Sequence, residues 1–270
     1  MKVYSIEGKE LKDIELPEQF QEPYHPNLIR RAVLASQSSK RQPYGAFPEA
    51  GKRASVRISK RRRDYRTSYG HGISRTPRKV TWHRGRQFGW VGAFSPNTTK
   101  GRRSHPPKAE KIWPQKLNKK ELDKALCSAL AATLTRHLVE SRNHQLPQNY
   151  PFLLEPKFES LNKTKEVLKV LENLGLEAEL SRASKKNIRA GRGKNRARPY
   201  HKKTGPLIVV SSSCPLQKAA TNIPGIDIAE VNNLHPELLA PGTHAGRLTL
   251  YTQPALERMH KEKLYLRTEK

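Results

Sequence analysis

The stretch Leu207-Ile-Val-Val210 decides the fold, because four consecutive apolar residues are typical of a strand that is buried on both faces of a parallel sheet. Strand and helix patterns alternate around it. Further strands are expected at residues 151–155, 226–231 and 247–251, and helices at 161–174, 176–183, 215–220 and from Pro254 onward. This order predicts an α/β fold: a three-layer α/β/α sandwich with a mostly parallel sheet.

The N-terminal part and the middle of the chain supply the remaining elements. Polar and apolar residues alternate within residues 1–16 on either side of Glu7-Gly8-Lys9, which indicates a short hairpin. Pro26 can begin a helix. The strongest helix pattern follows an approximate capping box made by Asn118 and Glu121. Its leucines recur every four residues, at Leu122, Leu126, Leu130, Leu134 and Leu138.

Positive charge is concentrated in two segments. The chain of 270 residues has a net charge of +28. Residues 40–111 hold 20 Lys and Arg against 3 acidic residues, and residues 181–203 hold 10 against none. These two segments carry 27 of the 28 surplus charges, so the rest of the chain is nearly neutral. Such a distribution favours a polyanionic partner.

The longer basic segment also lacks the residues that build a core. None of the 29 leucines lies between Leu34 and Leu117, whereas eight of the 16 glycines and eight aromatic residues lie within 40–111. Without large aliphatic side chains, burial cannot offset the cost of ordering the backbone, about 1–2 kcal/mol per residue. We therefore expect one globular domain formed by residues 1–39 and 112–270, a long basic internal extension at 40–111, and a short basic loop at 181–203 within the domain.

Catalytic, cofactor and metal sites are not expected. Ser211-Ser212-Ser213-Cys214 follows the central strand, but no GxGxxG, GxxxxGK[ST] or GxSxG pattern occurs there, so a helix N-cap is the simpler interpretation. His71, His83 and His105 have no metal-ligand spacing, and His137 and His144 are expected near the surface. Cys127 and Cys214 stand alone as ordinary, largely buried thiols, which indicates a reducing compartment.

Membrane insertion is not expected either. No apolar run of about 18 residues occurs, and the N-terminus is charged too early for a signal peptide.

The mixture of residues in the basic segments suits RNA. Arginine forks bind phosphates and stack on bases, aromatic rings offer stacking surfaces, and glycine permits close backbone approach. Patterns typical of DNA-binding helices are absent. The candidate RNA-binding residues are Arg53, Arg57, Lys60, Arg61, Arg62, Arg63, Arg66, Tyr69, His71, Arg75, Arg78, Lys79, Trp82, His83, Arg84, Arg86, Trp90, Lys100, Arg102, Arg103, His105, Lys108, Lys111, Lys185, Lys186, Arg189, Arg192, Lys194, Arg196 and Arg198.

Several motifs resemble a known family. Gly101-Arg-Arg-Ser-His-Pro-Pro-Lys108, Leu130-Ala-Ala-Thr133 and Pro241-Gly-Thr-His-Ala-Gly-Arg247 are similar to the large-subunit ribosomal protein L-four family in its archaeal and eukaryotic form. The resemblance covers almost the whole chain. The segment from Gly51 to Val91 is the least similar part, with Trp82, Phe88 and Trp90 as unusual residues.

The resemblance implies a structural, non-enzymatic protein of the large ribosomal subunit in the cytoplasm. In this family the globular domain lies on the subunit surface, and the long loop runs through ribosomal RNA to the wall of the peptide exit tunnel. There it forms a constriction together with the loop of another ribosomal protein, and members bind RNA early in assembly. The tunnel-facing tip implied here consists of Tyr69, Gly70, His71, Gly72, Arg84, Gly85 and Arg86.

The expected partners are therefore large-subunit ribosomal RNA and neighbouring ribosomal proteins, with no membrane and no homo-oligomer. An RNA-processing or RNA-modifying enzyme that uses the basic segment to hold its substrate is the alternative. It would require polar side chains that converge at the strand ends after Val210 or Val231. An RNA chaperone or regulator outside the ribosome is a third possibility.

Overall fold

The computed structural model describes residues 1–64, 67–85 and 87–266, and it divides into two compact units. The first unit comprises Met1–Lys40 and Pro114–Lys270; the second is Arg41–Trp113, which we call the arm. Within the described residues, no helix combines the length and the apolar character that crossing a membrane requires.

The first unit is built on a six-stranded sheet with the order β2-β1-β5-β10-β8-β9. Only the edge strand β2 runs antiparallel; every other pairing in this sheet is parallel. The strands are β1 (Lys2–Tyr4), β2 (Glu10–Asp13), β5 (Leu153–Leu154), β8 (Leu207–Val210), β9 (Asp227–Glu230) and β10 (Thr249–Thr252). The predicted strands around Leu207–Val210 are thus confirmed, although β5 is shorter than expected.

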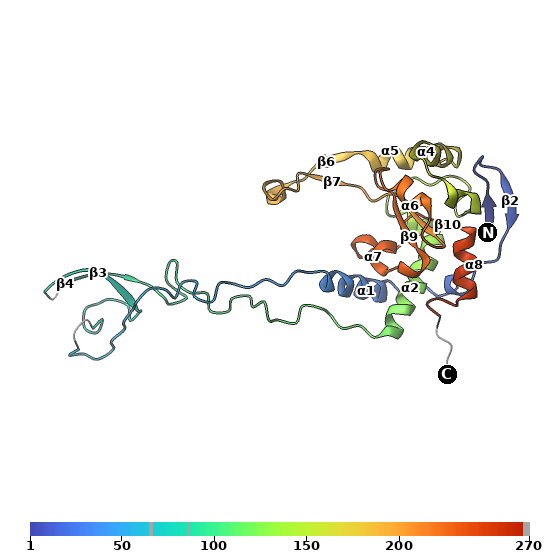
Figure 1. The fold of residues 1–270 in the computed structure, drawn as a ribbon. Helices are drawn as coiled ribbons and strands as arrows, with labels where there is room; N and C mark the ends of the chain where they lie inside the picture. The colour runs from blue at the N-terminus through green and yellow to red at the C-terminus, as the bar shows by residue number, and fades with distance from the viewer. Residues whose placement is uncertain (65–66, 86, 267–270) are drawn as a thin grey trace. The chain divides into compact units, whose positions relative to one another are not determined.

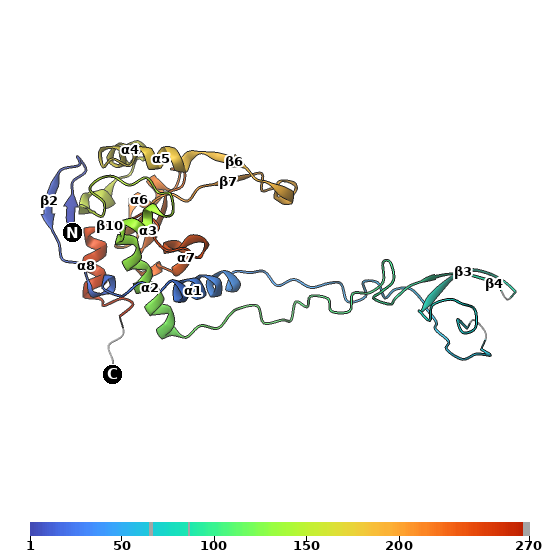
Figure 2. The same cartoon turned by 180° about the vertical axis from the view of Figure 1, so that it is seen from behind.

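Helices cover both faces of the sheet (Figures 1 and 2). Side chains of α1 (Pro26–Ser39), α2 (Lys119–Leu134), α7 (Pro236–Leu239) and α8 (Gln253–Lys261) contribute to one buried cluster. Those of α3 (Arg136–Glu140), α4 (Thr164–Asn173) and α6 (Pro215–Ala220) contribute to the other, and α5 (Glu177–Ser184) follows α4. The predicted three-layer α/β sandwich with a mostly parallel sheet is therefore confirmed.

Short 3₁₀ turns join these elements. They are η1 (Glu18–Phe20), η2 (Pro156–Ser160), η3 (Gly191–Arg196), η4 (Val231–Asn233) and η5 (Pro241–Thr243).

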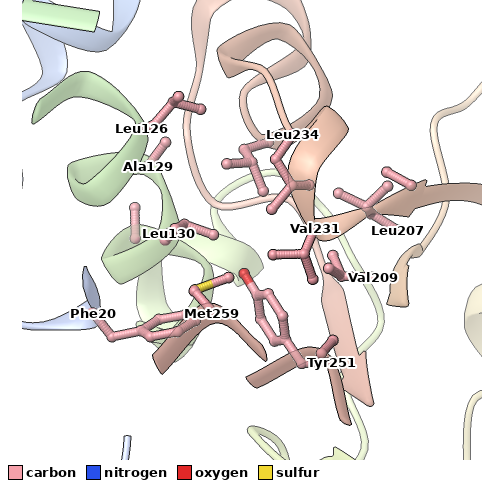
Figure 3. Close-up of a cluster of buried hydrophobic side chains, with 14 of the residues drawn as sticks. Phe20, Leu126, Ala129, Leu130, Leu207, Val209, Val231, Leu234, Tyr251 and Met259 are labelled. Atoms are coloured by element: carbon pink, nitrogen blue, oxygen red, sulfur yellow. The ribbon is translucent and has the colours of Figure 1, made fainter. Parts of the chain in front are cut away.

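Successive residues of the central strand enter opposite layers. Leu207 and Val209 lie in the cluster that α2 and α8 cover, whereas Ile208 and Val210 lie in the cluster that α4 and α6 cover. Because strand side chains alternate between faces, a strand buried on both sides has to be apolar at every position. Figure 3 shows the first cluster, in which Tyr251 of β10 lies among apolar side chains from the helices and from β8.

The capping box at the start of α2 is present, with the Asn118 backbone N–H donating to Glu121. The helix ends at Leu134, because Thr135 has an extended backbone with ψ 103°, and α3 begins at Arg136. The expectation of one helix through Leu138 was therefore wrong. The leucine spacing hides the break because α3 brings Leu138 back against the same apolar cluster.

Two small hairpins lie outside the main sheet. In the arm, β3 (Arg78–Arg84) pairs with β4 (Gln87–Gly92). In the first unit, β6 (Lys186–Ile188) pairs with β7 (Tyr200–Lys202), and Figure 1 shows this hairpin emerging after α5.

Candidate RNA interface

The arm begins and ends with two chain segments that lie against each other. The Ala46 backbone N–H donates to the Pro107 carbonyl at 3.0 Å. A Cβ on Gly51, whose φ is +75°, would lie 2.5 Å from the backbone nitrogen of Arg102. Only glycine fits there, since the obstructing atoms are backbone and the conformation is left-handed. The glycines of the arm thus allow two basic segments to approach closely.

Three aromatic side chains lie in a row on one face of the β3–β4 hairpin. The His83 and Phe88 rings are stacked with centroids 6.2 Å apart, and the Phe88 and Trp90 centroids are 5.4 Å apart. The Arg78 guanidinium lies 5.8 Å from the Trp90 centroid. An irregularity in register between Val80 and Trp82 makes this possible, because a one-residue bulge moves His83 onto the face that Phe88 and Trp90 share.

Trp82 covers the backbone of the opposite strand. It pairs with Gly89, and a Cβ on Gly89 would lie 2.1 Å from the Trp82 indole nitrogen. The Trp82 ring therefore lies directly over Gly89, so a side chain there would displace the ring, which is still 56% exposed. An exposed indole of this kind offers a stacking surface to a partner.

Hydroxyl groups organise the loop before β3. Thr67 Oγ1 donates to the Arg61 carbonyl at 2.7 Å, and Ser68 Oγ donates to the Ser59 carbonyl at 3.4 Å. Ser59, Thr67 and Ser68 are buried although they are polar. These local hydrogen bonds take the place of an apolar core, and the run Lys60–Arg63 is exposed on the same loop.

The arm neutralises little of its own charge. Arg57 pairs with Asp64 at 3.1 Å, and Arg53 pairs with Glu49 at 3.4 Å. Both arginine side chains are more than half exposed, so these pairs are weak. Since the segment 40–111 holds 3 acidic residues for 20 basic ones, a strongly positive surface remains for an anionic partner.

The root of the arm, formed by its first and last residues, contains two adjacent aromatic rings and two cationic side chains that contact them. Tyr44 and Trp113 have ring centroids 4.8 Å apart. The Arg41 guanidinium lies 4.8 Å from the Trp113 centroid and 5.5 Å from that of Tyr44, and Lys111 Nζ lies 5.4 Å from Trp113. These cation–π contacts stabilise the root. Sequence reasoning did not name Arg41, Tyr44 or Trp113 as site residues, because spacing alone does not reveal such contacts.

The shorter basic segment forms the β6–β7 hairpin. Its end is closed by hydrogen bonds from the Arg189 N–H to the Pro199 carbonyl at 2.7 Å and from the Arg198 N–H to the Gly193 carbonyl at 3.1 Å. The Arg189 side chain folds back, because its guanidinium donates to the Tyr200 carbonyl at 3.3 Å. The residues Gly191–Arg196 at this end form the 3₁₀ turn η3.

A buried ionic network fixes the base of this hairpin. Glu179 accepts hydrogen bonds from Arg182, from His144 Nδ1 at 2.7 Å and from the Gln145 N–H at 2.9 Å. Arg182 also donates to the Thr204 carbonyl at 2.7 Å, which ties α5 to the chain that leaves the hairpin after β7. Burial would raise the pKa of Glu179, but these hydrogen bonds hold it below its ordinary value.

The position of His144 differs from the one expected from the sequence. It was expected near the surface, yet it is buried at 5% exposure because Glu179, 35 residues further along the chain, provides its partner. Burial lowers the pKa of His144, and the nearby Arg182 adds to this effect. His137, in contrast, is exposed as expected.

The serines after β8 are not a helix cap. The residue before α6 is Cys214, which makes no side-chain capping hydrogen bond. Ser211 Oγ donates to Glu159 at 2.8 Å, the Ser211 N–H donates to the same carboxylate at 2.9 Å, and Thr252 Oγ1 donates to it at 2.5 Å. The carboxylate thus ties the carboxyl ends of β8 and β10 to η2.

The cysteines differ in burial. Cys127 is buried, which raises its pKa to about 11, and Cys214 is half-buried. Among the described residues, no group of three or more His, Cys, Asp or Glu side chains is arranged to hold a metal ion.

Most candidate RNA-binding residues are exposed. Arg78, Trp90 and Arg102 are half-buried, whereas Arg66 and Arg86 lie outside the described residues. The exposed ones are Arg53, Arg57, Lys60, Arg61, Arg62, Arg63, Tyr69, His71, Arg75, Lys79, Trp82, His83, Arg84, Lys100, Arg103, His105, Lys108, Lys111, Lys185, Lys186, Arg189, Arg192, Lys194, Arg196 and Arg198.

The expected tip residues lie in two turns. Tyr69, Gly70, His71 and Gly72 belong to the loop before β3, where both glycines have positive φ. Arg84 is the last residue of β3, and Gly85 follows it in the turn to β4 with φ +55°. A Cβ on Gly70, Gly72 or Gly85 would meet no atom within 4 Å, so both turns have open surroundings in the arm itself.

Comparison with known proteins identifies this combination of a basic arm, a basic hairpin and an α/β domain. The ribosomal protein L4/L1 family matches residues 14–262. The chain belongs to the ribosomal protein L4/L1 family. The matched range includes both the arm and the β6–β7 hairpin.

Archaeal relatives of the L4/L1 family align over nearly the whole chain. The large ribosomal subunit protein uL4 of Nanoarchaeum equitans is 48% identical over 97% of this chain and 98% of its own length. The uL4 proteins of Archaeoglobus fulgidus and Methanococcus maripaludis are 44% and 43% identical; they cover 95% and 96% of this chain, and the matches span 96% and 98% of their own lengths.

Proposed function

We propose that this chain is a structural RNA-binding protein of the large ribosomal subunit and takes part in its assembly. The observation that carries the proposal is the set of exposed cations on the arm and on the β6–β7 hairpin, in a chain that matches the L4/L1 family over residues 14–262. Exposed arginines and lysines neutralise phosphates, and the interleaved rings contact bases or riboses. The chain works in the cytoplasm as part of the ribosome, as its relatives are large-subunit proteins.

The two basic segments have different tasks in this proposal. Residues 1–39 and 112–270 form the globular domain, residues 40–111 act as an arm that enters between RNA helices, and residues 181–203 contact RNA beside the domain. The close pairing of the two segments of the arm supports the assignment of the arm to a position between RNA helices. Two segments that lie against each other without an aliphatic core between them form a narrow structure. Its ordering cost is offset when RNA covers it.

The tip is proposed to face the peptide exit tunnel, next to the loop of a neighbouring ribosomal protein. Tyr69 to Gly72 and Arg84 to Arg86 are the residues assigned to it. Their support is the resemblance to the family together with the open surroundings of Gly70, Gly72 and Gly85.

The enzyme alternative is not favoured. Polar side chains do converge at the ends of β8 and β10, but the Glu159 carboxylate accepts hydrogen bonds from Ser211 and Thr252 and links the strand ends. The family itself consists of ribosomal proteins.

Filter binding of the full chain to the large-subunit RNA of the same organism tests the proposal, with small-subunit RNA as the control. We expect tighter binding to large-subunit RNA and a steep loss of affinity between about 50 and 200 mM salt. A variant in which a short Gly-Ser linker replaces residues 43–111 should lose most of this affinity. Equal binding of both RNAs, or full affinity without the arm, would contradict the proposal.

A further inference from the structure

The β6–β7 hairpin carries an arrangement of side chains that an isolated hairpin does not favour. Lys186 lies directly opposite Lys202, and Ile188 lies directly opposite Tyr200. Residues that pair in an antiparallel ladder project to the same face, and so do residues two apart along a strand. These four side chains therefore share one face, whereas Asn187 and His201 project from the other.

This face is apolar at one end and doubly charged at the other. Ile188 is 69% exposed and Tyr200 is 55% exposed. Two lysines directly opposite each other repel, and a hairpin of two short strands is marginal in water. No acidic residue lies within residues 181–203, so this segment offers no carboxylate to offset the repulsion.

The hairpin is nevertheless held in place from both ends. Arg182 connects Glu179 with the Thr204 carbonyl at its base, and the Arg189 side chain holds its far end through the Tyr200 carbonyl. The Arg189 side chain also lies over Gly193, where a Cβ would be 2.6 Å from Arg189 Cδ. The hydrogen bond from Arg189 to the Tyr200 carbonyl fixes the backbone beneath the exposed ring. The face is therefore preorganised rather than formed on contact.

From this geometry we propose that Tyr200 and Ile188 form a stacking platform for an unpaired RNA nucleotide, whose flanking phosphates are bound by Lys186 and Lys202. The inference rests on the proposed function and adds to it a site with a defined ligand, a single-stranded nucleotide. A base stacks on the tyrosine ring, the sugar covers Ile188, and the phosphate charge removes the repulsion between the lysines. An isolated duplex does not offer such an unstacked base.

A photo-crosslinking experiment with the full chain tests the platform. The probe is a short uridine strand that contains 4-thiouridine, used alone or annealed to its complement, and adducts are located by mass spectrometry after trypsin digestion. We expect adducts on the peptide containing Tyr200 with the single strand and far fewer with the duplex. Titrating the adduct yield gives the affinity of this site apart from that of the arm.

Variants separate stacking from charge. Tyr200→Leu keeps apolar area but removes the ring, and should weaken the site about 5- to 140-fold, the range equivalent to one lost stacked base. Tyr200→Trp should retain the site, and His201→Leu, on the other face of the same strand, is the matched control. Lys202→Gln should lower the salt slope at this site by up to about 0.7, whereas Tyr200→Leu should leave the slope unchanged.

Several outcomes would refute the platform alone, and a different outcome would refute the proposed function. Adducts confined to the arm, equal affinity of the Tyr200→Leu variant, or a preference for duplex would overturn the platform while leaving RNA binding intact. If Tyr200 in purified large subunits crosslinks to a protein neighbour instead of RNA, the platform is also refuted. Absence of adducts anywhere on the chain would contradict the proposed function itself.

Discussion

Replacing Glu179 with glutamine should destabilise the globular unit strongly. Glu179 is fully buried and accepts two hydrogen bonds from Arg182, one from His144 and one from the Gln145 N–H. An amide retains one acceptor oxygen and brings an NH₂ group toward these donors. Arg182 then lacks its counter-charge, although it keeps the Thr204 carbonyl. Breaking a buried ion pair by removing one partner costs about 3–5 kcal/mol, and the retained carbonyl places the expected loss near 3 kcal/mol.

Urea unfolding followed by far-ultraviolet circular dichroism measures this loss. Tryptophan fluorescence is unsuitable, because Trp82, Trp90 and Trp113 all lie in the arm. The matched control is Glu140→Gln, which removes an exposed pair with Arg136 and should cost under about 1 kcal/mol. If Glu179→Gln destabilises no more than this control, the network does not stabilise the fold and the reasoning is refuted.

Further predictions concern the arm and pH. Gly51→Ala places a Cβ against backbone at 2.5 Å, so it should increase protease cleavage of the arm and weaken RNA binding; Gly70→Ala, which meets no atom within 4 Å, should do so far less. Changing Lys60–Arg63 to glutamine should lower the salt slope of RNA binding by up to about 3–4 in filter binding, and an unchanged slope would show that this run contacts no phosphate. The pKa of His144 is lower in the folded chain than in the unfolded chain. As the pH falls, the unfolded chain therefore binds a proton at His144 before the folded chain does. The free energy of unfolding should be highest above about pH 6.5 and should decrease toward lower pH by up to about 1.4 kcal/mol per pH unit. Urea midpoints measured between pH 7.5 and 5 should show this dependence, and His144→Asn should flatten it; an equal slope in both proteins would rule out His144 as its source.

The sheet and its helices could be predicted because their signals are local. Leu207–Val210 is apolar at every position since both faces are buried, and the capping box of Asn118 and Glu121 is visible within four residues. The end of α2 at Leu134 could not be predicted in the same way, because the leucine period continues through α3.

The two hairpins show what local patterns miss. Alternation in β3 is interrupted by the irregularity between Val80 and Trp82, so the sequence does not display a clean strand period. In β6 and β7, one of the three cross-strand pairs joins two lysines and another joins Asn187 with His201, so the sequence shows no apolar alternation, and Arg189 closes the end of the hairpin. Exposed cations could be listed from composition, but the platform made by Ile188 and Tyr200 requires the register.

His144 illustrates the limit for buried polar groups. Its partner Glu179 lies on α5, and nothing in the sequence near His144 indicates that a carboxylate will be adjacent. A histidine near a predicted helix end suggests a surface position, and only the tertiary fold reverses that expectation. Tyr200 and Lys202 of the proposed platform were not among the candidate residues for a related reason, since their place on one face depends on the pairing of β6 with β7.

Sedimentation of cell extract through a salt-containing gradient, with detection of this chain in each fraction, tests the central claim most directly. The chain should migrate with the large ribosomal subunit at moderate salt and dissociate only when salt is raised far enough to displace many phosphate contacts. Finding the full chain free at the top of the gradient, or with the small subunit, at moderate salt would contradict the assignment to large-subunit RNA.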